Sequence, residues 1–80
     1  MKTKLKIGGI TYKVIIKDLE ELGKTDFTKS EIYLDSKLNQ DQKIATLIHE
    51  VIHCINSQLS EKDVEFLAQA TFQIIKDNDL

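Results

Sequence analysis

The spacing of the apolar residues changes at about residue 38, and this change constrains the fold more than any other feature of the sequence. Before residue 38 the apolar residues alternate with polar ones, as in strands that bury one face; after it they recur every three or four residues, as in amphipathic helices. No repeat or low-complexity segment interrupts either part. Strands followed by helices predict an α+β fold, with residues 1–80 forming a single domain.

A pair of glycines, Gly8 and Gly9, separates two alternating segments near the N-terminus. A two-residue turn at these glycines would pair Ile7 with Ile10 and Leu5 with Tyr12. The same register places the apolar residues on one face of a β-hairpin. These residues are Leu5, Ile7, Ile10, Tyr12, Val14 and Ile16.

The residues after the hairpin predict one more strand. Residues 18–26 have the composition of a polar connection that contains Gly23, whereas residues 29–35 carry Ile32 and Leu34 at strand spacing. We therefore expect a three-stranded antiparallel sheet, made of the hairpin and an edge strand.

Two helices are predicted in the second half of the chain. Asn39 with Gln42 three residues later is a relative of the capping box, and Ser60 with Asp63 suits a second one. Residues 56–59 would form the turn between the helices. Because this turn is short, we expect roughly antiparallel helices whose apolar stripes pack on the buried face of the sheet, in the order βββαα.

The first predicted helix contains the motif His49-Glu50-Val51-Ile52-His53. Residues four apart lie on one face of a helix, so His49 and His53 can bind the same ion, and both fall outside the apolar stripe. Glu50 is poorly placed to be a ligand beside them but can reach a water on the metal. This HExxH spacing predicts one zinc ion and Glu50 as the general base in peptide hydrolysis.

A catalytic zinc site usually takes three protein ligands, and the candidates for the third are Glu61, Asp63 and Glu65. Asp63 lies on the opposite flank of the second helix and suits capping. In an antiparallel helix pair, Glu61 would face His53 and Glu65 would face His49. We expect Glu61 to be the third ligand and Glu65 to accept a hydrogen bond from the second nitrogen of His49, with an exchange of these two roles as the alternative.

Other candidate residues have simpler interpretations. Cys54 is expected to be a small buried residue and not a ligand. Tyr12 and Tyr33 are conceivable oxyanion donors, but an aromatic residue on a strand more often serves packing. The lysines of the strands are expected to be solvated edge residues.

The spacing of Glu61 and Glu65 after the HExxH motif resembles the gluzincin metallopeptidases. The run TLIHEVIHCINSQLSEKDVEFLAQATFQIIKDN is similar to small phage and prophage proteins related to the ImmA/IrrE metallopeptidases and the mini-gluzincins, over about residues 28–78. The resemblance implies a minimal zincin-like metallopeptidase domain. It also implies that Ile32, Tyr33 and Leu34 form an edge strand that aligns an extended peptide by strand addition. The chain departs from the larger relatives by having Glu65 where aspartate is common, and by its short link between the helices.

Charge and composition limit the classes of binding partner that we expect. The chain has 11 basic and 13 acidic residues and a formal net charge of -2, which argues against nucleic-acid binding. It has no apolar run long enough for a membrane span or a signal peptide, so we expect a cytoplasmic protein, in the host cell if phage encoded. The expected partner is a peptide or protein substrate, and a second copy or a partner chain that completes the cleft is left open. The alternative function is a non-catalytic zincin-fold binding module, or a regulator that docks a protein partner.

Overall fold

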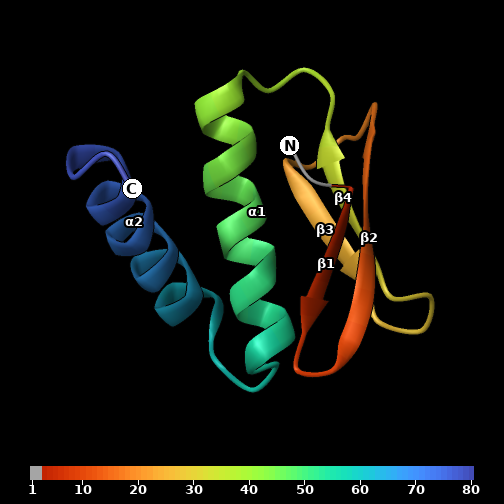
Figure 1. Cartoon of the computed structure of the whole chain (residues 1–80). Helices are drawn as coiled ribbons and strands as arrows, with labels where there is room; N and C mark the ends of the chain where they lie inside the picture. Colours follow the sequence, from red (N-terminus) through yellow and green to blue (C-terminus); the bar gives the residue numbers. More distant parts are fainter. Residues whose placement is uncertain (1–2) are drawn as a thin grey trace.

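The computed structural model describes residues 3–80, and its elements follow in the order ββββαα. The predicted α+β class with two helices is confirmed, with one strand more than expected (Figure 1). The elements are β1 (Lys4–Ile7), β2 (Ile10–Lys17), β3 (Gly23–Asp26), β4 (Glu31–Asp35), α1 (Gln40–Ile55) and α2 (Glu61–Asp77).

The predicted hairpin forms with the predicted register. β1 pairs antiparallel with β2, and Ile7 lies opposite Ile10 and Leu5 opposite Tyr12. Gly8 and Gly9 have φ angles of 57° and 83°, in the left-handed region that a two-residue hairpin turn requires and that glycine adopts at no steric cost.

The sheet is mixed and four-stranded, so the prediction of three antiparallel strands is wrong. The strand order is β1-β2-β4-β3, and β2 pairs parallel with β4. The chain leaves β2, forms β3 at the far edge, and returns as β4 in the space between them. Residues 18–30 are long enough for the crossover that parallel neighbours need.

β3 lies where the sequence predicted only a connection. Its residues, GKTD, include no large apolar side chain, so the alternation that marks a half-buried strand is missing. The turn that follows is held by the Asp26 carboxylate, which accepts hydrogen bonds from the Thr28 hydroxyl and from the amides of Thr28 and Lys29. The Thr28 hydroxyl is the main reason why the pKa of Asp26 is lowered.

The strand that carries Ile32, Tyr33 and Leu34 is not an edge strand, and this corrects the sequence prediction. β4 has β2 on one side and β3 on the other, so both rows of its backbone groups are already paired. Ile32 and Leu34 are fully buried. A peptide therefore cannot be added to β4, and β3 occupies the edge beside α1.

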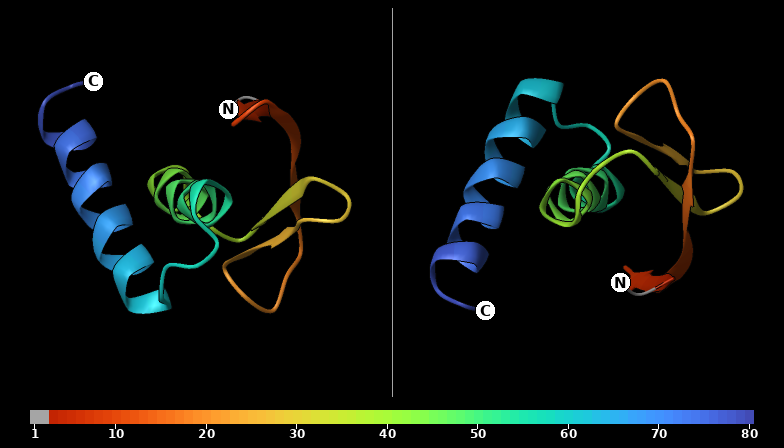
Figure 2. Two further views of the ribbon diagram at one scale, coloured as in Figure 1. Left: turned by 90° about the horizontal axis from the view of Figure 1, so that it is seen from below. Right: turned by 90° about the horizontal axis from the view of Figure 1, so that it is seen from above.

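The two helices form separate layers. α1 lies between the sheet and α2, and only α1 covers the sheet (Figure 1). Figure 2 looks along α1 and shows α2 crossing it obliquely. The expectation that both helices pack on the sheet is therefore wrong, because α1 alone covers its buried face. Both predicted caps form: Asn39 and Gln42 make a capping box, and the Ser60 side chain accepts a hydrogen bond from the Asp63 amide.

The core has one part in each interface between layers. Between the sheet and α1 it consists of Tyr12, Val14, Ile32 and Leu34, with Leu47 and Cys54 of α1 packed against them. On α2 the buried side chains are Val64 and Ala68. This second part fixes the position of α2 on α1, and with it the position of the acidic residues at the start of α2.

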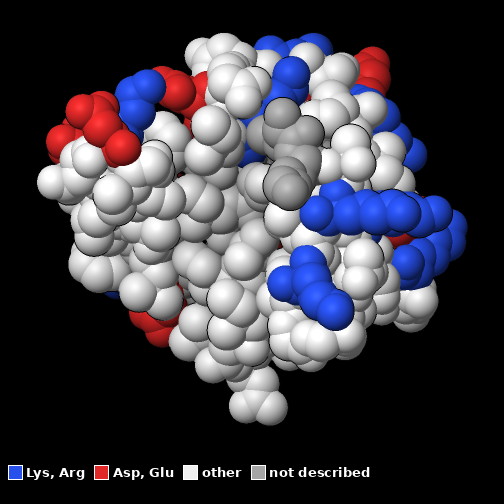
Figure 3. Space-filling model, viewed as in Figure 1, with Lys and Arg blue, Asp and Glu red and all other residues white. Residues whose placement is uncertain are grey.

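The strands expose their lysines, as predicted. Lys4, Lys6, Lys13 and Lys17 are all exposed. Figure 3 shows basic atoms over the strands, a group of acidic atoms over the C-terminal end of α2, and mostly uncharged atoms over the middle of the helices. In the described part of the chain, neither α1 nor α2 has the length and apolar character needed to cross a bilayer.

Candidate metal centre

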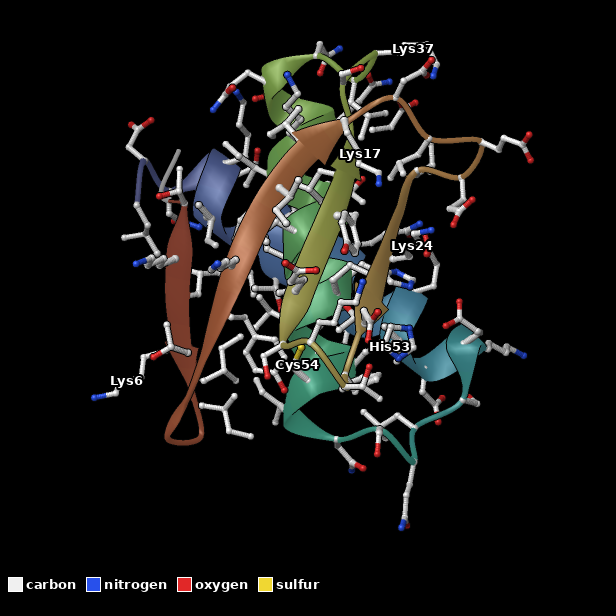
Figure 4. The ribbon with its side chains drawn as sticks, turned by 90° about the vertical axis from the view of Figure 1, so that its right-hand side faces the viewer. Lys6, Lys17, Lys24, Lys37, His53 and Cys54 are labelled. Atoms are coloured by element: carbon white, nitrogen blue, oxygen red, sulfur yellow. The ribbon has the colours of Figure 1, made fainter. Side chains whose placement is uncertain are left out.

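His49 and His53 lie one turn apart on α1 and face the start of α2. Their ring centroids are 4.9 Å apart and the ring planes meet at 62°. Their side chains are 18% and 20% exposed, so the rings are partly shielded but reachable. Figure 4 places His53 on the β3 side of the molecule, with Cys54 behind the sheet. The prediction that the rings point away from the core and toward acidic residues of the second helix is confirmed.

Glu61 and Glu65 approach the histidines in the predicted pairs. A carboxylate oxygen of Glu61 lies 2.5 Å from Nε2 of His53, and its other oxygen lies 3.5 Å from Nε2 of His49. A carboxylate oxygen of Glu65 lies 3.1 Å from Nδ1 of His49. The neighbours expected for an antiparallel helix pair are therefore confirmed, although the helices cross obliquely.

The two imidazoles and Glu61 form a donor set that fits zinc. Each of the three side chains offers one ligand atom, and these atoms lie within 4.8 Å of one another. Two histidines and one glutamate are a ligand combination found in catalytic zinc sites, which keep the fourth position for water. The chemistry of the donors and their spacing are both compatible with one ion.

Glu65 contacts the nitrogen of His49 that faces away from Glu61. A carboxylate on Nδ1 favours the tautomer whose Nε2 lone pair is free for a metal. Glu65 itself accepts a hydrogen bond from the Gln69 side chain at 2.7 Å, which restrains its carboxylate. This arrangement favours Glu61 as the third ligand and Glu65 as the residue that orients His49. It is less compatible with Glu65 as the ligand and Glu61 as the orienting residue.

The Glu50 side chain points toward β3, whereas the histidines face α2. It is 7% exposed, and its carboxylate accepts a hydrogen bond of 2.7 Å from the Thr25 hydroxyl. Thr25 was missed at the sequence level because its segment was interpreted as a connection. The sequence offers no strong signal for it, since a single threonine in a polar segment has no periodicity.

Two hollows flank the cluster. One has a volume of about 560 Å³ and lies between α1, α2 and the start of β3; the other, of about 350 Å³, follows β3 and includes Thr25 and Phe27. They share Gly23, His49, Glu50 and Glu61. The candidate metal centre therefore lies where two depressions in the surface meet.

The remaining candidates do not line the two hollows beside the cluster. Cys54 packs against the core but is only partly buried, less than the sequence predicted, and burial raises the pKa of its thiol. Tyr12 is 5% exposed and its pKa is raised, mainly by burial. The Tyr33 hydroxyl donates a hydrogen bond to Glu31 on the outer face of the sheet, which raises the pKa of Tyr33. Neither tyrosine lines the two hollows beside the cluster, so the structure supports their interpretation as packing residues.

Comparison of the chain with protein-family models, curated proteins and solved structures finds no match. The resemblance to gluzincins and to small phage proteins therefore stays a prediction.

Proposed function

We propose that this chain is a zinc-dependent, HExxH-type metallopeptidase that hydrolyses peptide bonds. The observation that carries the proposal is the arrangement around His49. The Nε2 atoms of His49 and His53 both face the Glu61 carboxylate. The Nδ1 atom of His49 faces the Glu65 carboxylate. Glu50 lies on the same helix beside this donor set, buried and hydrogen bonded to β3.

The chain's own residues have distinct tasks in this proposal. His49, His53 and Glu61 would hold the zinc, which when bound supplies Lewis acidity and lowers the pKa of a water molecule to about 7. Glu50 accepts the proton of the attacking water and delivers it to the leaving amine. Glu65 keeps the His49 ring in its binding orientation, and Thr25 does the same for the Glu50 carboxylate.

The substrate would lie along β3 and not along β4. β3 pairs with β4 on one side only, so its other edge offers backbone groups to an extended peptide. Gly23 and Thr25 of β3 line the hollows beside the cluster, which brings such a peptide close to Glu50. This replaces the substrate strand inferred from the resemblance.

The proposed substrate class and cellular compartment are inferred from the sequence. The net charge of -2 and the scattered charges favour a peptide or protein substrate over nucleic acid. We place the protein in the cytoplasm, that of the host cell if the resemblance to phage proteins holds. The proposal leaves open whether a second copy of this chain or a partner chain completes the cleft.

The test combines metal content with hydrolysis. Protein purified without a histidine tag is analysed for zinc by mass spectrometry and then incubated with a quenched-fluorescence peptide library. We expect one zinc per chain and measurable cleavage. In Glu50→Gln we expect unchanged zinc content and folding, with cleavage lowered at least about 100-fold, the lower end of general acid–base contributions.

The matched control is Glu20→Gln, the same substitution at an exposed residue outside the cluster. It should leave both zinc content and cleavage unchanged. Zinc-loaded protein that never cleaves the library, or cleavage that survives in Glu50→Gln, would contradict the proposal. The first result would favour the alternative in which the domain docks a protein partner.

A further inference from the structure

The N-terminal hairpin concentrates positive charge on the outer face of the sheet. Residues 3–17 contain no acidic residue, whereas residues 18–80 carry all 13 acidic residues of the chain. The lysines of the hairpin are Lys4, Lys6, Lys13 and Lys17, all exposed. Lys4 lies directly opposite Lys13 in the register of β1 and β2, and like charges in such positions repel each other.

Lys4, Lys6 and Lys13 form no ion pair within the described part of the chain. Glu31 of β4 lies beside Lys13, but its carboxylate accepts a hydrogen bond from the Tyr33 hydroxyl. The positive charge on β1 is therefore available to a negatively charged ligand.

The same strand has a free backbone edge. β1 is the first strand in the order β1-β2-β4-β3, so among the described residues only β2 pairs with it. The Thr3 carbonyl accepts a hydrogen bond from the Val14 amide, and the pairs of an antiparallel ladder alternate between hydrogen-bonded and non-hydrogen-bonded. Leu5 therefore turns its backbone groups toward β2, whereas Lys4 and Lys6 turn theirs away from it. Figure 4 shows β1 at the margin of the sheet, with the Lys6 side chain extending beyond it.

The inner face of β1 is apolar. Leu5 and Ile7 are partly buried against the core, and Ile10, which lies opposite Ile7, is 49% exposed. A strand added beside β1 would place successive side chains on opposite faces of the sheet. Its residues next to Lys4 and Lys6 would lie on the basic outer face, and the residues between them on the apolar inner face. The edge therefore fits a segment in which acidic and apolar residues alternate.

Two other occupants fit this edge less well. A second copy that paired through its own β1 would bring lysines beside lysines, and lysines on an edge strand oppose such pairing. A nucleic acid would attract the lysines through its phosphates. It has no strand backbone to pair with the outward amides and carbonyls of Lys4 and Lys6, and no apolar side chains for the inner face. Both comparisons favour a protein segment.

We propose that the free edge of β1 is a docking site for an extended segment of a partner protein in which acidic and apolar residues alternate. The segment would join the sheet as an additional strand. This inference does not rest on the proposed peptidase function, because β1 and β3 form opposite edges of the sheet. With about 4.8 Å between neighbouring strands, roughly 14 Å of sheet separates β1 from β3. A partner docked on β1 therefore leaves the β3 edge free for a substrate.

The docking site is tested with fluorescent peptides of matched length. The probes are acetyl-EVEVEV-amide, acetyl-EEEVVV-amide, acetyl-KVKVKV-amide and a single-stranded DNA oligonucleotide. The protein is the full chain with the substitution Glu50→Gln, so that the proposed hydrolysis cannot consume a peptide. We expect EVEVEV to bind at least about 10-fold more tightly than each of the other probes, because only EVEVEV matches both faces of β1. Stronger binding of the DNA, or equal binding of EVEVEV and EEEVVV, would overturn the inference.

Amide hydrogen exchange distinguishes strand addition from a purely electrostatic contact. The amides of Lys4 and Lys6 face away from β2, so an added strand should pair with them. We expect bound EVEVEV to slow their exchange at least about 10-fold and to leave the exchange of the β3 amides unchanged. Protection of the β3 amides alone would overturn the docking site while supporting the proposed substrate edge. Protection of Lys4 and Lys6 in a protein that cleaves no peptide of the library would support the docking site and count against the peptidase.

Charge reversal supplies a matched pair of variants. The double variant Lys4→Glu and Lys6→Glu should fold, because it changes exposed side chains and removes the like-charge pair with Lys13. We expect its affinity for EVEVEV to fall at least about 10-fold and its affinity for KVKVKV to rise. The control is Lys24→Glu with Lys29→Glu, which makes the same change of net charge at exposed residues of β3 and the turn after it. This control should leave both affinities unchanged, and an equal loss in the two double variants would overturn the inference.

Discussion

The Thr25 hydroxyl of β3 donates a hydrogen bond of 2.7 Å to the carboxylate of Glu50 in α1. This contact connects the edge strand to the residue with the proposed general-base role. Glu50 is also one of the two buried charged or polar residues among those the structure describes, the other being Asp35. A buried carboxylate without a donor is costly, so Thr25 contributes both to folding and to the orientation of Glu50.

Removing this hydroxyl should affect stability and turnover together. In Thr25→Val we expect unfolding in urea to show a loss of about 1–3 kcal/mol, the cost of an unsatisfied buried polar group. With the peptide library we expect kcat to fall about 10-fold while KM and zinc content stay the same, because only the orientation of Glu50 changes. Thr11→Val on the exposed side of β2 is the control and should change none of these quantities. A fall in zinc content equal to the fall in kcat would contradict a role limited to Glu50.

The sequence predicted those features that depend on local pattern. The register of the hairpin follows from two glycines, and the start of α1 follows from Asn39 and Gln42. The pairs His53 with Glu61 and His49 with Glu65 follow from helical spacing and a short turn. Each of these depends on residues close together in the chain, where geometry leaves few alternatives.

The missed features depend on contacts between distant segments. β3 is recognisable as a strand only through its pairing with β4, because its own composition has no strand pattern. The parallel pairing of β4 with β2 also depends on tertiary contacts and not on local sequence. It moved Ile32 and Leu34 from the predicted edge into the centre of the sheet, and it gave Thr25 a position beside Glu50.

Glu61 and Glu65 should differ in their effect on zinc affinity. Glu65→Gln removes a group that supports His49, and we expect a loss of about 10–100-fold, as is usual for such supporting groups. Glu61→Gln removes a ligand, so we expect a larger loss. Asp63→Asn is the matched control in the same helical turn and should retain wild-type affinity. Competition with a fluorescent zinc chelator measures all three, and a larger loss in Glu65→Gln would show that the roles are exchanged.

Close packing of β3 on α1 depends on Gly23. A Cβ atom at this position would lie 2.7 Å from Cγ2 of Thr46 and 3.0 Å from the carbonyl oxygen of Tyr33. We expect Gly23→Ala to lower the free energy of unfolding by about 1–3 kcal/mol, as for other overpacked sites. Thr46→Ser removes the methyl group, so the double variant should be more stable than the sum of the single effects by at least about 0.5 kcal/mol. Lys24→Ala with Thr46→Ser is the control pair and should be additive.

Acid should weaken the fold through Asp35, which is 6% exposed at the end of β4. The Lys37 ammonium group lies 2.9 Å from its carboxylate, and the hydrogen bond from Lys37 is the main reason why the pKa of Asp35 is lowered. A lowered pKa in the folded state means that the ionised carboxylate contributes stability above its unfolded pKa of about 3.9, and that this contribution is lost as the pH falls through the folded value. We therefore expect the difference in unfolding free energy between wild type and Asp35→Asn to be largest above about pH 4 and to shrink below it. Asp79→Asn, at an exposed residue, should show no such trend. A pH-independent difference for Asp35→Asn, measured by urea unfolding from pH 7 downward, would mean that the ion pair with Lys37 does not stabilise the fold.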